Sequence, residues 1–210
     1  MDNKYYTNLL KVMLKTDQLE NVDLSKVDKL YRFKRNDLVL LPRVKEIIGI
    51  LKSFQYDISS IVDFGTQRGA LMFPLLDTFP GIQFTGVDIS DDIYQFMLPL
   101  TQDNHYFNFN MVQADITKSI QSISDKSVDM VLASEILEHL ENPIDAVLEA
   151  VRIAKKYIII TVPSKADNNP EHIQYFKIDD MKALLEKVGL KNVVVHPNRN
   201  YNLFMITLDY

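Results

Sequence analysis

The sequence predicts an α/β fold: a seven-stranded, mostly parallel sheet with helices on both faces and an N-terminal helical cap. Two observations support this prediction. From Gln55 onward, short apolar runs alternate with amphipathic stretches, which is typical of strands and helices wound into a parallel sheet. The run IVDFGTQRG at residues 61–69 indicates a buried strand that turns into a helix around Gly65 and Gly69. Such a unit is typical of nucleotide-like ligand sites, so the fold is expected to be Rossmann-like.

The apolar runs predict strands in the second part of the chain, and the length of 210 residues fits one large domain. We divide the chain into an N-terminal helical cap, residues 1–41, and a Rossmann-like domain, residues 42–210. The predicted strands are 60–64, 83–88, 107–112, 128–133, 157–162, 192–197 and 202–208.

Helix signals fill most of the intervals between these strands. Ser90 precedes one apolar repeat as an N-cap, and Asn142 with Pro143 begins another helix that is expected to reach Lys155 and Lys156. A third helix follows Asp179 and ends at Gly189. Residues 5–18 and 42–54 are also expected to be helical.

Composition excludes several classes of protein. The chain has no cysteine, which excludes a thiolate zinc site, and its net charge of −5 argues against general binding of nucleic acid. The longest strongly apolar run, residues 157–162, is too short to span a bilayer, so we expect a cytoplasmic protein with no membrane or DNA partner. Residues 1–56 nevertheless carry eleven Lys or Arg against seven acids, which indicates either a solvated helical surface or a basic lid.

Four segments that could bind a ligand share one property, which is that each lies at the carboxyl end of a predicted strand. They are residues 61–69, Asp88, residues 113–115 and residues 133–143. In open parallel sheets, ligands bind outside those ends, so the four segments are expected to converge on one site.

These segments resemble the class I S-adenosylmethionine-dependent methyltransferases over roughly residues 42–210. The family's first loop usually reads Asp-x-Gly-x-Gly-x-Gly, matched here by Asp63, Gly65 and Gly69, with Gln67 in place of the middle glycine. The resemblance implies that residues 65–69 wrap the methionine part of the cofactor, that Asp88 binds the ribose, and that Ala114 with Asp115 holds the adenine. It implies that S-adenosylmethionine is bound by Asp63, Gly65, Thr66, Gln67, Gly69, Asp88, Ile89, Ala114, Asp115 and Ser134.

The catalytic candidates lie in the fourth segment. Glu135, Glu138 and His139 would share one face if residues 135–140 form a helical turn, and His172 follows the fifth strand. We assign His139 and Glu135 as catalytic, with His139 as the general base because its ordinary pKa is near neutrality. We assign no metal ligand, although the pattern also resembles metal-assisted methyltransferases that act on the 2′-hydroxyl of small RNAs or on ubiquinone precursors.

The predicted function is methyl transfer from S-adenosylmethionine to an oxygen or nitrogen of a small molecule. RNA is disfavoured as an acceptor, and a homodimer is compatible with the sequence. One alternative is a scaffold protein that has lost turnover, which Gln67 keeps open. A nicotinamide-dependent oxidoreductase is disfavoured because Gln67 and Ala70 stand where its second and third glycines belong.

Overall fold

The computed structural model describes residue 18 and residues 42–54, 57–102 and 106–209. The helices are α3 (Pro42–Phe54), α4 (Met72–Thr78), α5 (Asp91–Met97), α6 (Pro143–Ile153) and α7 (Ile178–Lys187), with 3₁₀ turns η2 (Leu98–Gln102) and η4 (Leu137–His139). The strands are β1 (Ser60–Phe64), β2 (Gln83–Asp88), β3 (Phe109–Gln113), β4 (Val128–Ser134), β5 (Ala154–Pro163), β6 (Val193–Pro197) and β7 (Tyr201–Thr207). The predicted cap, residues 1–41, lies outside the described residues except for Gln18.

The seven strands form one sheet in the order β3-β2-β1-β4-β5-β7-β6. The first five strands are mutually parallel, whereas β7 runs antiparallel to both β5 and β6. The predicted sheet is therefore confirmed, including the antiparallel pair of strands at the end of the chain. The strand order reverses between β1 and β4, and a crevice is expected there beyond the carboxyl ends of the strands.

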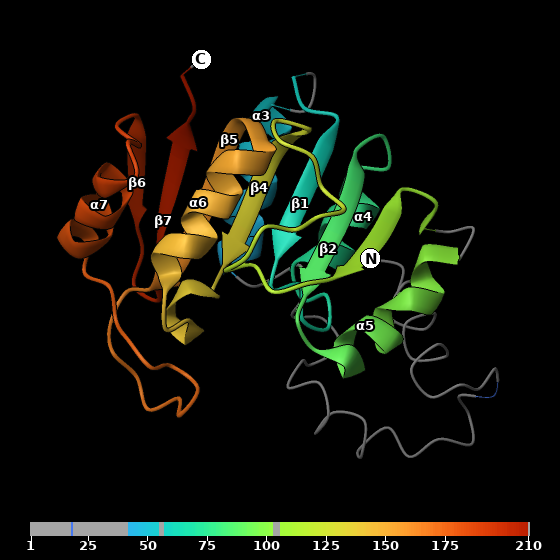
Figure 1. Cartoon of the computed structure of the whole chain (residues 1–210), viewed down its shortest axis with the longest axis horizontal. Coiled ribbons are helices and arrows are strands. Elements are labelled where there is room, and N and C mark those ends of the chain that lie inside the picture. Colours follow the sequence, from blue (N-terminus) through green and yellow to red (C-terminus); the bar gives the residue numbers. More distant parts are fainter. Residues whose placement is uncertain (1–17, 19–41, 55–56, 103–105, 210) are drawn as a thin grey trace.

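Helices cover both faces of the sheet, as predicted (Figure 1). On one face, α3, α4 and α5 pack on strand side chains such as Ile61, Phe84 and Leu132. On the other face, α6 and α7 pack on the strand residues that alternate with these, such as Val62 and Val131. Because successive strand residues point to opposite faces, fully apolar strands are what a sheet covered on both sides requires.

The helix ends follow the sequence signals with three exceptions. One is the start of α7, which was predicted to follow Asp179 but begins at Ile178, with Lys177 as its N-cap. Ser90 Oγ accepts the Ile93 N–H at the start of α5, and Gly189 takes a left-handed φ of 84° beyond the end of α7. Asn142 stands at the N-cap of α6, but its side chain makes no capping hydrogen bond. The helix also ends at Ile153, so the prediction that it reaches Lys155 and Lys156 is wrong, because both residues belong to β5.

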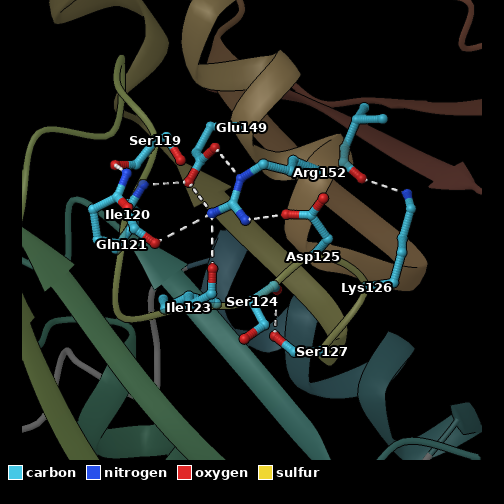
Figure 2. A network of polar contacts seen from close by, with 11 residues as sticks. Ser119, Ile120, Gln121, Ile123, Ser124, Asp125, Lys126, Ser127, Glu149 and Arg152 are labelled. Atoms are coloured by element: carbon cyan, nitrogen blue, oxygen red, sulfur yellow. Dashed lines mark hydrogen bonds and ion pairs between the residues drawn. The ribbon is translucent and has the colours of Figure 1, made fainter.

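The connection from β3 to β4, residues 114–127, contains no helix, and every residue in it is described. A polar network on α6 holds this connection instead (Figure 2). The buried Glu149 carboxylate accepts the Ile120 N–H at 2.7 Å and pairs with the Arg152 guanidinium, which also donates to the Ile123 carbonyl at 2.9 Å. Buried backbone groups must find a partner, and here charged side chains supply it.

A further polar contact fixes α3 against the antiparallel edge of the sheet. The Glu46 carboxylate accepts the Tyr201 hydroxyl at the start of β7 and lies 3.1 Å from His196 Nδ1 on β6. Burial, together with that hydrogen bond, raises the pKa of the Tyr201 phenol. Among the described helices, none is both long enough and apolar enough to cross a membrane.

Candidate functional site

The four predicted segments meet at one edge of the sheet. Phe64 at the end of β1 is in register with Val87 of β2 and Ala133 of β4, and Asp88 is in register with Gln113 of β3. Since these strands are parallel, the loops that follow them leave the sheet side by side. Two adjoining cavities lie among these loops.

The first, which we call the Asp63 cavity, has a volume of about 180 Å³. It is lined by Arg43, Asp63, Gly65, Thr66, Gln67, Ala70, Leu71, Ser134 and Glu135. The second, the Asp88 cavity, has a volume of about 140 Å³ and is lined by Gly65, Gln67, Asp88, Ile89, Ala114, Asp115, Ile116, Ile136 and Leu140. Gly65 and Gln67 line both cavities. Nine of the ten predicted cofactor-binding residues therefore line this pair of cavities, and only Gly69 does not.

The turn after β1 takes left-handed backbone conformations at alternate residues. The φ angles are 69° at Gly65, 51° at Gln67 and 77° at Gly69. A Cβ atom at Gly65 would lie 2.6 Å from Ile136 Cδ1, and one at Gly69 would lie 2.3 Å from the Phe73 ring. Gly65 therefore keeps bare backbone against the cavities, whereas Gly69 allows the turn to pack on α4.

The Asp88 carboxylate is held by two backbone amides. Its Oδ2 accepts the Gln67 N–H at 2.9 Å and its Oδ1 accepts the Ser90 N–H at 3.0 Å. The apolar Ile89 beside it is 65% exposed, which leaves a hydrophobic surface beside the carboxylate. Opposite them, Asp115 Oδ1 accepts the Thr117 hydroxyl and amide, and these hydrogen bonds lower the pKa of Asp115.

Asp63 lines its cavity and is only 3% exposed. Burial raises the pKa of Asp63 to about 7, against the opposing hydrogen bond from the Thr66 hydroxyl. Arg43, in the first turn of α3, lines the same cavity, and its buried Nε has no hydrogen-bond partner among the described residues. Arg43 is a site residue that the sequence did not predict. The positive excess of residues 1–56 included it, but no motif distinguished it from its neighbours.

Glu135 borders the Asp63 cavity in a conformation that the sequence did not predict. Its φ is 53°, its N–H donates to the Thr161 carbonyl at 2.9 Å, and η4 begins only at Leu137. The condition for a shared face, a helical turn over residues 135–140, is therefore not met, because Glu135 lies before the 3₁₀ turn and not within it. Burial raises the pKa of Glu135, whose Oε1 has no hydrogen-bond partner in the described structure.

Glu138 and His139 instead form a cluster with His172, which follows β5. One ligand atom from each lies within 4.8 Å of the others. Glu138 is fully buried, and neither of its carboxylate oxygens has a hydrogen-bond partner within the described ranges. Burial, together with the Glu135 charge, raises the pKa of Glu138 to about 8. His172 Nε2 lies 4.0 Å from Glu138 Oε1. A buried carboxylate without hydrogen bonds is costly, so Glu138 is stabilised by a proton or by a nearby cation.

Both imidazoles of the cluster are oriented by their Nδ1 atoms. His139 Nδ1 lies 2.9 Å from the Glu171 carbonyl oxygen, and His172 Nδ1 lies 2.9 Å from Asp167 Oδ1. Since both of these oxygens can only accept, each Nδ1 carries a proton, and in the neutral form of each ring Nε2 then has the lone pair. This arrangement is typical of metal-binding histidines, whose second nitrogen donates to a carbonyl or carboxylate.

Sequence comparison assigns the family. Residues 57–196 match the sequence model of a family described as a methyltransferase domain. The chain belongs to this methyltransferase family. With the observed strand order, it is a class I methyltransferase that uses S-adenosylmethionine, as predicted from the sequence. A search of curated protein sequences finds no match.

Solved structures with the same fold include several methyltransferases. A S-adenosylmethionine-dependent methyltransferase from Archaeoglobus fulgidus is 17% identical, with a TM-score of 0.61 over 89% of this chain and 100% of that chain. The magnesium protoporphyrin IX methyltransferase of Synechocystis PCC 6803, solved with bound S-adenosylhomocysteine, is 14% identical, with a TM-score of 0.66 over 92% and 97%. The carbon methyltransferase of CurJ is 12% identical, with a TM-score of 0.69 over 98% and 67%. At these identities, the similarity establishes the fold and not the acceptor.

Proposed function

We propose that this methyltransferase transfers the methyl group of S-adenosylmethionine to an oxygen or nitrogen of a small molecule. The observation that carries the proposal is the pair of cavities that share Gly65 and Gln67. One cavity has the Asp88 carboxylate beside the apolar Ile89, and the other is bordered by the cationic Arg43. The cofactor has the same two-part character, with an adenosyl group at one end and an amino acid at the other. When bound, it supplies a methyl group on a positively charged sulfur.

The residues present fit that cofactor. The Asp88 carboxylate, already oriented by two amides, can accept hydrogen bonds from a ribose diol, and Ile89 and Ile116 offer apolar surface for a purine. The unpartnered Nε of Arg43 can pair with the carboxylate of the amino-acid end. Bare backbone at Gly65 allows close approach between the two ends.

Glu135 is the better placed of the two predicted catalytic residues. It lines the Asp63 cavity beside Ser134, whereas His139 lines neither cavity and belongs to the cluster with Glu138 and His172. A carboxylate at the cavity wall can take a proton from an acceptor hydroxyl or amine as that group is methylated. We therefore assign the general base to Glu135 when the acceptor is deprotonated directly.

A second candidate function, metal-assisted O-methylation, is favoured by the cluster of Glu138, His139 and His172. A buried carboxylate without hydrogen bonds and two oriented imidazole Nε2 atoms form a ligand set that suits a divalent cation. Such a cation would bind an acceptor hydroxyl and lower its pKa, which fits an oxygen acceptor such as a phenol or a ribose 2′-hydroxyl.

Calorimetric titration with S-adenosylhomocysteine tests the first proposal. Binding to the wild-type protein is expected, and Asp88→Ala should weaken it by roughly 1 to 3 kcal/mol through loss of charge-assisted hydrogen bonds. No binding by the wild type at high micromolar ligand would contradict the proposal. The acceptor can then be sought by incubating the enzyme and labelled S-adenosylmethionine with fractionated metabolites.

Metal binding is tested separately, by titrating the chelator-treated protein with Mn²⁺ and recording its paramagnetic resonance signal. Glu138→Gln should abolish tight binding, whereas Glu141→Gln, which changes an exposed acid in the following turn, should not. Equal binding by both variants, or none by the wild type, would exclude the metal centre.

Cytoplasmic location, a homodimer and the exclusion of DNA and RNA acceptors stay predictions from the sequence.

A further inference from the structure

Gln67 is a strained residue at the centre of the site. Among the described residues, three that are not glycine have a left-handed φ, namely Gln67, Lys126 and Glu135. Lys126 lies beside the Arg152 network (Figure 2), whereas Gln67 and Glu135 both line the Asp63 cavity. Left-handed conformations are costly for residues with a Cβ, and residues that adopt them cluster at functional sites.

Gln67 lies where the two cavities meet, and unlike a glycine it has a side chain that could bind a ligand there. Gly65 and Gln67 are the two residues that line both cavities, and Gly65 has no room for a side chain because Ile136 fills that space. Of the two residues that line both cavities, Gln67 is therefore the one that has a side chain. It is exposed and has no hydrogen-bond partner within the described part of the chain, so its carboxamide is free to bind a ligand.

The backbone of Gln67 also fixes which part of a ligand it faces. Its N–H donates to Asp88 Oδ2 at 2.9 Å, so the residue lies against the carboxylate that we assign to the ribose diol. A carboxamide offers two donors and one acceptor, which complement the hydroxyl groups of a sugar. A ribose bound to Asp88 would lie within reach of this amide.

We propose that the Gln67 carboxamide is a cofactor-binding group that hydrogen-bonds the ribose of S-adenosylmethionine at the junction of the two cavities. The proposal rests on the proposed function and deepens it. Gln67 thus replaces the family's middle glycine with a polar group that holds the cofactor. This role is the opposite of the alternative in which Gln67 marks a scaffold protein that has lost turnover.

Two variants separate the side chain from the backbone. Gln67→Ala removes the carboxamide but keeps a Cβ in the left-handed conformation, whereas Gln67→Gly removes both the carboxamide and the strain. Their affinities are measured by calorimetry for S-adenosylhomocysteine and for 5′-methylthioadenosine, which keeps the ribose and sulfur but lacks the amino-acid end. Thermal unfolding without ligand is recorded for each, and Gln95→Ala, an exposed glutamine of α5, is the control.

Both Gln67 variants should bind both ligands about 5- to 10-fold more weakly than wild type, as expected for the loss of one hydrogen bond. The unfolding temperature of Gln67→Gly should equal or exceed that of wild type, and Gln95→Ala should leave affinity unchanged. Affinity and stability would then move independently, which a purely structural role for Gln67 does not produce.

Unchanged affinity in Gln67→Ala would overturn the proposal, even if Gln67→Gly bound more weakly, since the loss would then come from a more flexible loop. Weaker binding of S-adenosylhomocysteine with unchanged binding of 5′-methylthioadenosine would overturn the assignment to the ribose. Failure of the wild type to bind either ligand would instead contradict the proposed function, so the two failures are distinguishable.

Discussion

Asp63→Asn is expected to remove a large pH dependence of folding stability. The carboxyl of Asp63 is 3% exposed, and its burial raises its pKa to about 7, compared with 3.8 for an ordinary aspartate. Between these two values the folded chain holds a proton that the unfolded chain releases. The stabilisation is therefore complete below pH 3.8 and is lost as the pH rises through 7. A difference of about 3 pKa units corresponds to at most about 4 kcal/mol.

Urea unfolding at pH 5, 6, 7 and 8 measures this effect as the difference between wild type and variant. Asparagine keeps an acceptor for the Thr66 hydroxyl, which lies 3.1 Å from Asp63 Oδ2, but it cannot ionise. Relative to the wild type, the variant's free energy of unfolding should rise by about 3 kcal/mol between pH 5 and pH 8, because about two of the three pKa units lie in this range. Asp92→Asn, at an exposed acid of α5, is the control for the change from carboxyl to amide. If the difference between wild type and Asp63→Asn is the same at pH 5 and pH 8, the reasoning is wrong.

Three further predictions follow from packing and charge. Gly69→Ala should lower the free energy of unfolding by about 2 to 4 kcal/mol, because the new Cβ would meet the Phe73 ring at a left-handed φ. In the same urea titration, Gly81→Ala, with open space around its Cβ, should have little effect. Arg152→Met should lower the free energy of unfolding by about 3 to 5 kcal/mol, because it leaves the buried Glu149 carboxylate without its cation. A cost below 1 kcal/mol, as expected for the exposed pair of Lys118 and Asp115, would show that the network is dispensable. Arg43→Met should weaken calorimetric binding of S-adenosylhomocysteine about 10-fold and leave 5′-methylthioadenosine unaffected. Equal losses for the two ligands would place Arg43 away from the amino-acid end.

Most of the sheet could be predicted from the sequence because every strand is a short apolar run bounded by turn residues. All seven predicted strands are present, with ends that differ by three residues or fewer. The error at Lys155 and Lys156 has a physical cause. Both residues are charged and both flank an apolar run, so a helix end and a strand start have the same pattern there. Only pairing with β4, where Ala154 is in register with Val128, determines the boundary.

The site was predictable where loops follow strands, and less so where distant elements meet. Asp63, Asp88 and Asp115 were identified because parallel strands bring their ends together. Arg43 was missed because its place at the cavity depends on how α3 packs, which Glu46 fixes through Tyr201 and His196. That contact joins residues about 150 positions apart, and no local pattern encodes it.

The network around Glu149 has a consequence for how the protein opens. Amides in irregular loops normally exchange their hydrogens with water quickly, because such loops open independently of the core. The Ile120 amide instead donates to a carboxylate that is itself buried under α6, and Ile120 is 2% exposed. Releasing it breaks the contact with α6 and exposes Ile116, Ile120 and Ile123, which belong to the apolar core on that face of the sheet. The connection from β3 to β4 therefore unfolds together with the sheet as one cooperative unit, although it has no helix or strand of its own.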